Sequence, residues 1–306
     1  MAKIVVLGSL NIDLVVTVPR LPQPGESVLG DRLGSYPGGK GANQAVAAAR
    51  LGGQVAMVGR VGRDSFGAEL IENLESNGVD ASRVARDPAE PTGAALIYVE
   101  HGGHNMIAVA PGANATVGPH DAERAVAMLG PGDLLVMQLE IPFAVVEQAT
   151  LAARRAGAMV LLNAAPAQRL KPEVFAQLDA LVVNEREATA LGDLEDPSAA
   201  AAALRAMGAK IVIVTLGPAG SLFCDDAGVH RVEPFPVKSV DSTGAGDAFV
   251  GALAVGLAAK LPGEAAIRFA NAAGAAATCS LGAQAALPRL DDLRRLFGLH
   301  VPSLEA

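Results

Sequence analysis

From about residue 120 onward, short apolar runs alternate with segments whose apolar residues recur at helical spacing. The apolar runs predict strands at 134–139, 158–162, 180–183 and 211–215. The segments around them predict helices at 121–129, 142–156, 185–191 and 197–207. A strand that is followed by a helix returns to its sheet as a parallel neighbour. The alternation therefore predicts an α/β fold, with a Rossmann-like, mostly parallel central sheet and helices on both faces.

Two segments interrupt this pattern. Residues 14–37 and 92–109 are rich in β-forming residues, proline and glycine, and they show no helical periodicity. We predict that they leave the core and pair into a small antiparallel β-sheet that acts as a lid. The α/β core then consists of residues 1–13, 38–91 and 110–306.

Composition limits the classes of function. Hydrophobic residues make up 51% of the 306 residues and charged residues 18%, which predicts a folded chain with a large core. A net charge of −8 and an aromatic content of 3% argue against nucleic acid as a partner. Only two cysteines are present, and no apolar stretch approaches the roughly 20 residues of a membrane span. We expect a cytoplasmic protein with no membrane association.

A glycine-rich turn, 241–247, ends in a carboxylate and runs into an apolar helical segment. Gly244 and Gly246 leave backbone N–H groups uncovered at a helix N-terminus, where an anion is stabilised. Asp247 is an unfavourable neighbour for an anion unless it accepts a proton. Phosphoryl transfer needs that combination of anion-binding donors and a carboxylate for the attacking hydroxyl. An ordinary helix start with a first-turn Asp explains the stretch equally well.

Polar residues follow several predicted strands, at the sheet edge where α/β proteins bind ligands. These residues are Asn11, Asp13, Glu140, Asn184, Glu187, Thr215 and Gly217. Any one of them is more often a cap or turn residue, but their joint placement on one edge favours a site. Lys40, which lies between glycines, is placed either to contact a ligand or to lie at the surface of a helix start. Asn184 and Glu187 share one helical face, as a pair that holds magnesium-bound water or as a simple helix cap.

The motifs resemble the ribokinases of the PfkB carbohydrate kinase family. The resemblance rests on 8–13 (GSLNID), 24–26 (PGE), 38–44 (GGKGANQ), 111–114 (PGAN), 184–187 (NERE), 215–217 (TLG) and 242–247 (STGAGD). It extends from the first strand to about Pro288, with the motifs in the family's order.

The resemblance implies ATP-dependent phosphorylation of D-ribose at its 5-hydroxyl, with Asp247 as the base. The backbone amides of Gly244, Ala245 and Gly246 would form the anion hole. The sugar would be held by Asn11, Asp13, Gly39, Lys40, Asn43 and Glu140, together with Asp247. The nucleotide would contact Asn184, Thr215, Gly217, Gly220, Ala245, Gly246 and Asn271. Glu187 would organise Mg²⁺ through water, and the lid would form the contact of a homodimer.

The family also implies a monovalent cation site beside the anion hole, occupied by K⁺. Its ligands would come from Asp241, Thr243, Ala277, Ser280 and Gly282. Ala286 stands where the family commonly has a serine hydroxyl, so one ligand is lost. The strength of K⁺ activation is therefore open.

Three alternatives stay open at this point. Another PfkB kinase would act on deoxyribose, a different pentose or a nucleoside, although the few aromatic residues disfavour a base-binding pocket. A nicotinamide-dependent oxidoreductase would need a Gly-x-Gly-x-x-Gly motif after the first strand, which 8–11 lacks. A catalytically silent sugar-binding regulator would have little reason to keep Asp247.

Overall fold

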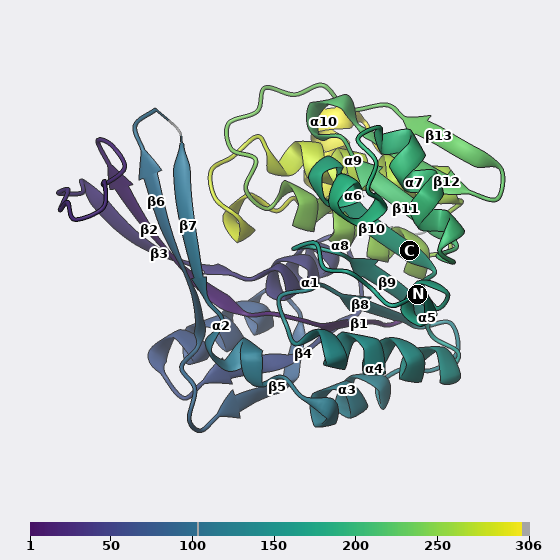
Figure 1. Ribbon diagram of the computed structural model, residues 1–306, viewed down its shortest axis with the longest axis horizontal. Helices are drawn as coiled ribbons and strands as arrows, with labels where there is room; N and C mark the ends of the chain where they lie inside the picture. The colour runs from purple at the N-terminus through teal and green to yellow at the C-terminus, as the bar shows by residue number, and fades with distance from the viewer. Residues whose placement is uncertain (103, 302–306) are drawn as a thin grey trace.

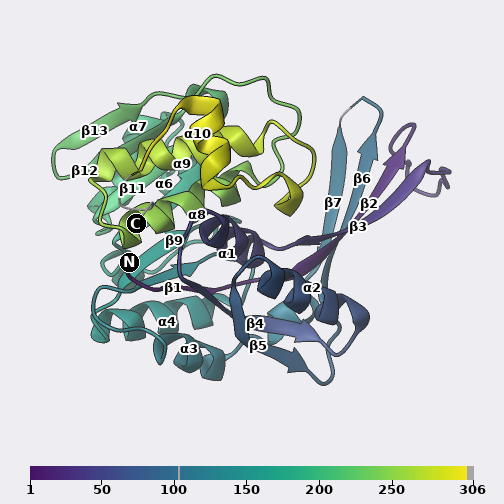
Figure 2. The ribbon, with the colours of Figure 1, turned by 180° about the vertical axis from the view of Figure 1, so that it is seen from behind.

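The computed structural model describes residues 1–102 and 104–301, whose strands form two separate sheets. The large sheet has nine strands and lies at the centre of the molecule, and the small sheet projects from one side of it (Figure 1). The view from behind shows the same separation (Figure 2). The α/β architecture with an additional small sheet is thereby confirmed.

The strands of the large sheet alternate with helices along the chain, as the sequence predicts. In order across the sheet they are β13 (Gly228–Val232), β12 (Ser221–Asp225), β11 (Ile211–Thr215), β10 (Ala180–Asn184), β9 (Met159–Asn163), β8 (Leu134–Met137), β1 (Ile4–Leu7), β4 (Val55–Gly62) and β5 (Asp80–Asp87). Strands β11 to β5 pair in parallel, whereas β12 and β13 form an antiparallel hairpin at one edge. The carboxyl ends of the parallel strands therefore meet at one edge of the sheet.

The helices cover both faces of the large sheet. One face packs against α1 (Lys40–Arg50), α2 (Ser65–Ser76), α8 (Ala245–Ala258), α9 (Gly263–Ala277) and α10 (Leu290–Phe297). The other face packs against α3 (Pro119–Val126), α4 (Phe143–Arg155), α5 (Pro172–Phe175), α6 (Glu185–Gly192) and α7 (Pro197–Ala206). Central strands such as β1 and β8 are buried along their whole length, which explains their continuous apolar sequences.

Among the described residues, one β-strand and one α-helix were not predicted from the sequence. The edge strand β5 has the polar sequence DASRVARD and is exposed at half of its positions, so it lacks the apolar run of a central strand. Helix α5 is only four residues long, which is too short to produce a periodic pattern.

The small sheet contains the two predicted segments, but its strand pairing differs from the prediction. Its order is β3 (Arg32–Gly38), β2 (Asn11–Val18), β6 (Gly93–Glu100) and β7 (Asn105–Ala110). The pairs β2–β3 and β6–β7 are antiparallel, whereas the central pair β2–β6 is parallel. The fully antiparallel sheet was therefore wrong. Each segment is a hairpin that begins at the core, so the two outgoing strands run in the same direction where they meet (Figure 1).

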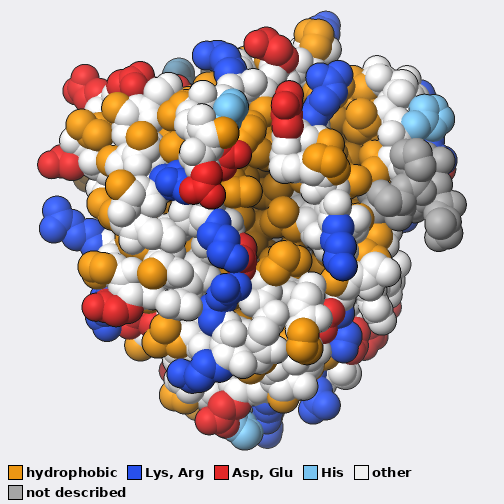
Figure 3. Space-filling model, turned by 90° about the vertical axis from the view of Figure 1, so that its right-hand side faces the viewer, with side chains coloured by type: hydrophobic (Ala, Val, Ile, Leu, Met, Phe, Trp, Pro, Cys, Tyr) orange, Lys and Arg blue, Asp and Glu red, His pale blue; other side chains and the backbone are white. Residues whose placement is uncertain are grey.

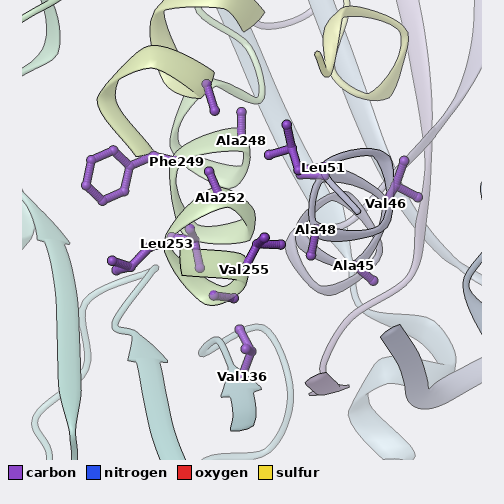
Figure 4. Packing of buried hydrophobic residues seen from close by; sticks show 14 of the residues in the cluster. Ala45, Val46, Ala48, Leu51, Val136, Ala248, Phe249, Ala252, Leu253 and Val255 are labelled. Atoms are coloured by element: carbon purple, nitrogen blue, oxygen red, sulfur yellow. The ribbon is translucent and has the colours of Figure 1, made fainter. Parts of the chain in front are cut away.

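Helices α1 and α8 pack unusually closely because small residues face each other. A Cβ atom at Gly251 of α8 would lie 2.5 Å from Ala47 Cβ and 2.9 Å from Gln44 O of α1. Figure 4 shows Ala48 of α1, and Leu51 directly after this helix, next to Val255 and Ala248 of α8. This contact brings the first turns of the two helices together, and those turns carry much of the site described below.

Within residues 1–102 and 104–301, no helix is long and apolar enough to cross a membrane. On the face in Figure 3, acidic and basic side chains are interspersed, and neither sign gathers into one field.

Candidate active site

The glycine-rich turn at 241–247 leads directly into α8. Gly244 is the N-cap residue of this helix and has a φ of 76°, in the left-handed region that favours glycine. The amide of Ala245 donates to Ser242 O at 3.2 Å within the turn, and the amide of Ala248 donates to Gly244 O at 2.8 Å. Gly246 lines two adjoining cavities. The turn thus presents the start of a helix, with its favourable field for an anion, to both cavities.

Asp247 is buried in the first turn of α8, and both of its carboxylate oxygens accept hydrogen bonds. Asn43 Nδ2 donates to Oδ2 at 2.8 Å, and Gln44 Nε2 donates to Oδ1 at 3.0 Å. Burial raises the pKa of Asp247, and Glu140 raises it further, while Lys40 and the two amide donors oppose the rise. The net direction is upward. The carboxylate is therefore oriented by two side chains of α1 and is more basic than an exposed aspartate.

A cluster of acidic residues with one lysine surrounds this carboxylate. Burial and the charges of Glu140 and Asp247 raise the pKa of Asp13 to about 7, although Lys40 lowers it. Lys40 Nζ lies 3.8 Å from Glu140 Oε1, and Glu140 Oε2 accepts hydrogen bonds from Ser9 Oγ at 2.6 Å and Lys40 N at 3.1 Å. The predicted residues Lys40, Glu140 and Asp247 are thus close enough to Asp13 for their charges to act on its pKa.

The remaining predicted sugar residues lie at the same place. Asn11 Oδ1 accepts a hydrogen bond from Asn114 Nδ2 at 2.7 Å, and Gly39 is the N-cap residue of α1. Asn43 Oδ1 is buried and has no donor in the described part of the chain. An acceptor of this kind is free to bind a ligand hydroxyl.

Two cavities adjoin at the start of α8 and share Thr215 and Gly246 in their linings. The larger cavity, of about 320 Å³, contains six of the seven predicted nucleotide residues, namely Thr215, Gly217, Gly220, Ala245, Gly246 and Asn271. The seventh, Asn184, lines the smaller cavity of about 140 Å³, together with Glu187, Lys40 and Asp247. Asn271 Nδ2 donates to Val232 O and Glu233 O, so it also fastens the segment that forms one wall of the larger cavity.

Asn184 and Glu187 cap helix α6 reciprocally. Asn184 Oδ1 accepts from Glu187 N at 2.9 Å, and Glu187 Oε2 accepts from Asn184 N at 2.8 Å. Burial raises the pKa of Glu187, against the effects of this backbone hydrogen bond and of Lys40. The capping interpretation is confirmed, and the position of both residues on the smaller cavity leaves the magnesium interpretation open.

Two of the residues predicted for a monovalent cation, Thr243 and Gly282, donate hydrogen bonds to Asp241. Its Oδ1 accepts from Thr243 N at 2.9 Å and Thr243 Oγ1 at 2.7 Å, and its Oδ2 accepts from Gly282 N at 2.8 Å. Partial burial raises the pKa of Asp241, but these hydrogen bonds outweigh burial and lower it overall. Asp241 is therefore an ionised carboxylate that links the 241–247 turn to the segment after α9. Its single negative charge suits a monovalent cation. Among the described residues, no group of three or more His, Cys, Asp or Glu side chains could hold a metal ion.

Sequence reasoning assigned no role to three buried amides behind Asp247. Gln44, Gln138 and Asn163 form a hydrogen-bonded chain that ends on this carboxylate. Asn163 ends β9, so the same strand-end signal that pointed to Glu140 also applied to it. Gln138 follows β8, and Gln44 lies inside the 38–44 motif. Residues 234–237, which form one wall of the larger cavity, were not predicted either, because no polar residue at a strand end marks them.

The sequence profile of the pfkB family carbohydrate kinases matches residues 1–290. The chain belongs to this family. The ribokinase of Bacillus subtilis is 39% identical over 297 residues, covering 97% of this chain and 100% of that protein. The deoxyribokinase of Salmonella typhi is 36% identical over 304 residues, covering 97% and 99%.

Solved structures of PfkB kinases match the whole architecture. A ribokinase from Thermotoga maritima superimposes with a TM-score of 0.90 at 36% identity, covering 98% of this chain and 100% of that one. An Arabidopsis thaliana ribokinase complexed with ribose and ATP gives a TM-score of 0.89 at 32% identity, covering 98% and 99%. The family assignment therefore rests on agreement in sequence, fold and motif order, and it makes the oxidoreductase alternative untenable.

Proposed function

We propose that this PfkB kinase transfers the γ-phosphoryl group of ATP to the 5-hydroxyl of D-ribose, giving ribose 5-phosphate and ADP. The observation that carries the proposal is Asp247, a buried and oriented carboxylate in the first turn of α8, where two cavities adjoin. Relatives named ribokinase and a ribokinase complexed with ribose and ATP support the choice of substrates.

In the proposed reaction, Asp247 accepts the proton of the 5-hydroxyl as that oxygen attacks the γ-phosphorus. The bond between the γ-phosphorus and the β,γ-bridging oxygen breaks, and ADP leaves. The raised pKa of Asp247 favours proton transfer, while its two amide donors hold the carboxylate in place. The backbone at Gly244, Ala245 and Gly246 stabilises negative charge on the transferred group.

The sugar is proposed to contact Asn11, Asp13, Gly39, Lys40, Asn43 and Glu140. These residues carry the acceptors and donors that several adjacent hydroxyl groups require. The unpartnered Asn43 Oδ1 supports this role because a buried acceptor without a donor is unfavourable unless a ligand supplies one.

The nucleotide is proposed to occupy the larger cavity, against Thr215, Gly217, Gly220 and Asn271. Asn184 and Glu187 line the smaller cavity next to the phosphoryl-transfer point, where they would hold water bound to Mg²⁺. Mg²⁺ would neutralise charge on the ATP phosphates. Glu187 suits this role because one of its oxygens is fixed by the cap of α6.

A monovalent cation, K⁺, is proposed to lie between the turn and the segment after α9. Asp241 supplies the negative charge, and Thr243, Ala277, Ser280 and Gly282 offer further oxygens. A cation there would reinforce the positive field of the anion hole. Ala286 contributes a methyl group where a hydroxyl ligand would lie, so K⁺ activation should be weak.

The segments 14–37 and 92–109 are proposed to act as a lid over the sugar and as the contact of a homodimer, while 1–13, 38–91 and 110–306 form the kinase core. Asp13 lies on β2 of the small sheet and is also part of the candidate sugar site. Closing this sheet over the sugar would exclude water from the transfer step.

Deoxyribose is the second candidate substrate, because a deoxyribokinase is nearly as similar as the ribokinases. A panel of D-ribose, 2-deoxy-D-ribose, other pentoses and nucleosides separates the two. The assay is ADP release from ATP, with and without K⁺, followed by NMR to identify the phosphorylated carbon. Ribose should give the highest kcat/KM, and the absence of ribose-dependent ADP release would overturn the proposal.

A further inference from the structure

A chain of buried side-chain amides lies behind the proposed catalytic base. Gln138 Nε2 donates to Gln44 Oε1 at 2.7 Å. Gln44 Nε2 donates to Asp247 Oδ1 and to Asn163 Oδ1, both at 3.0 Å. Asn163 Nδ2 in turn donates to the backbone oxygen of Val182 at 3.1 Å. Gln44 is 1% exposed and Gln138 is fully buried, so bulk water does not compete for these hydrogen bonds.

The direction of every hydrogen bond in this chain follows from one backbone carbonyl. Val182 O can only accept, so Asn163 must present its NH₂ group to β10 and its oxygen to Gln44. Gln44 must then donate to Asn163, which places its NH₂ group next to Asp247 as well. The side-chain oxygen of Gln44 then faces Gln138, so Gln138 must donate its NH₂ group to that oxygen. A flip of any one amide would set two oxygens or two NH₂ groups against each other.

The arrangement also leaves one acceptor unsatisfied. Gln138 Oε1 is buried and has no donor within the part of the chain that the structure describes. The opposite orientation of Gln138 would place an oxygen against Gln44 Oε1 and remove the donor that orients Gln44. The fixed direction turns this oxygen away from Gln44, and it stays there although no donor meets it.

We propose that Gln44 is the positioning residue of the catalytic base: it holds one oxygen of Asp247 in place by a hydrogen bond whose direction is set through Asn163 from the backbone of β10. The proposal rests on the proposed function, since it gives Gln44 a role in the same phosphoryl transfer. Asn43 binds the other oxygen of Asp247 and is also proposed to contact the sugar. Gln44 faces the amide chain on its other side, so it acts on the reaction through Asp247.

Isosteric substitutions at Gln44 test this role. Gln44→Met removes the donor, and Gln44→Glu replaces it with a second carboxylate next to Asp247. Both changes should reduce kcat for the sugar by 10-fold or more and shift the acid limb of the kcat/KM profile to higher pH, with the larger shift for Gln44→Glu. The KM for ATP should change by less than 2-fold. The charged groups around Asp247 are Lys40 of α1, Asp13 of β2, Glu140 after β8 and Glu187 of α6 across the smaller cavity. All four are unchanged in these variants.

A direct readout separates positioning from a loss of folding. The side-chain carboxyl of Asp247, assigned by comparison with Asp247→Asn, can be titrated by ¹³C NMR in the full-length protein without substrates. Its pKa should be higher in Gln44→Met than in the wild type. Asn163→Leu, which removes the anchor but leaves Gln44 in place, should give a smaller shift in the same direction.

The outcomes distinguish this inference from the proposed function. A wild-type protein that phosphorylates no sugar in the panel overturns the proposed function, while the NMR titration still reports on Gln44. A protein that phosphorylates ribose, with Gln44→Met keeping kcat within 2-fold and an unshifted Asp247 pKa, overturns the positioning role alone. The positioning role is also overturned if kcat falls while both the acid limb of the kcat/KM profile and the NMR-derived pKa of Asp247 stay unshifted. A general packing defect would produce that result.

Discussion

At the residue scale, Asp247 must be both basic and ionised. Burial makes it basic by raising its pKa, while Lys40, Asn43 and Gln44 stabilise the charged form. A carboxylate that is only buried would be protonated and unable to accept a proton. A carboxylate that is only stabilised by a lysine and amide donors would have a low pKa and be a poor base.

Removal of this base should abolish most of the activity. Asp247→Asn keeps the shape of the side chain but cannot take the proton, so kcat should fall by about 10²- to 10⁴-fold. The KM for ATP should be nearly unchanged, because Asp247 lines only the smaller cavity. Steady-state ADP release checks this, and near-normal turnover would contradict the base assignment.

Asp13 illustrates a site residue that opposes stability. Its pKa is raised to about 7, above the ordinary value of 3.8, because it is buried near Glu140 and Asp247. The folded state therefore binds this proton more tightly than the unfolded state. The stabilisation from the bound proton is complete below about pH 4 and is lost as pH rises through 7.

Asp13→Asn should consequently stabilise the ligand-free protein at high pH. The gain in Tm over the wild type should be larger at pH 8, where Asp13 carries its buried charge, than at pH 5, where it is mostly protonated. Thermal denaturation at the two pH values checks this. A Tm difference that is independent of pH would contradict the raised pKa, and sugar-dependent activity should fall in parallel.

At the element scale, the contact between α1 and α8 determines the geometry of the site. Asn43 and Gln44 are on α1, and Asp247 is on α8, so their hydrogen bonds depend on the spacing of the two helices. That spacing requires a glycine at 251, where a Cβ would lie 2.5 Å from Ala47 Cβ.

Gly251→Ala should therefore reduce both stability and activity. Overpacking of this kind costs about 1–3 kcal/mol, which exceeds the helix-propensity gain of about 1 kcal/mol for replacing glycine with alanine. Gly263→Ala in α9 is the matched control, because a Cβ there meets no atom within 4 Å. Urea unfolding should show a loss for the first variant and no loss for the second. Equal stability of the two variants would argue against a tight helix contact.

The segment after α9 carries the other element-scale prediction. Ala286 ends a 3₁₀ turn at 284–286, close in sequence to Gly282, which donates to Asp241. Ala286→Ser restores a hydroxyl and should lower the K⁺ concentration that gives half-maximal activation. ADP release as a function of K⁺ at constant ionic strength checks this, with Ala285→Ser as the control. An unchanged K⁺ response would place the cation away from 286.

At the scale of the whole molecule, the small sheet is apolar on both faces. The strand register places Ile107, Val109 and Tyr36 on the face of Asp13, and Met106, Tyr98 and Leu33 on the opposite face. All six side chains are at least one third exposed. A sheet that leaves large apolar side chains exposed on both faces is typical of an interface between subunits.

We expect a homodimer in solution, and adjacent residues can identify the face that it uses. Ile107 and Met106 are 56% and 50% exposed and point to opposite sides of β7. Ile107→Lys and Met106→Lys should differ, with one variant monomeric and the other still dimeric by light scattering. A monomeric wild type at micromolar concentration, or two variants with unchanged mass, would contradict an interface on this sheet.

The sequence by itself determined the repeated strand–helix units, the two interrupting hairpins and the glycine-rich turn at 241–247. These features are local, because they depend on apolar periodicity, glycine positions and the residues that follow each strand. The strand-end signal also placed Asp13, Glu140 and Asn184 near one another before any distance was known. Strand β5 was not predicted because its sequence is polar. Its pairing with β4, rather than an apolar run of its own, stabilises it.

Only the tertiary structure decided what acts on Asp247. Gln44 is some 200 residues away in sequence and Gln138 over 100, and nothing in the spacing of these positions links them to the carboxylate. The close packing of α1 on α8 creates the contact, and a backbone oxygen in β10 sets its direction. Hydrogen-bond direction depends on the full set of donors and acceptors that folding brings together. The parallel pairing of β2 with β6 was decided in the same way, because it depends on where both hairpins leave the core.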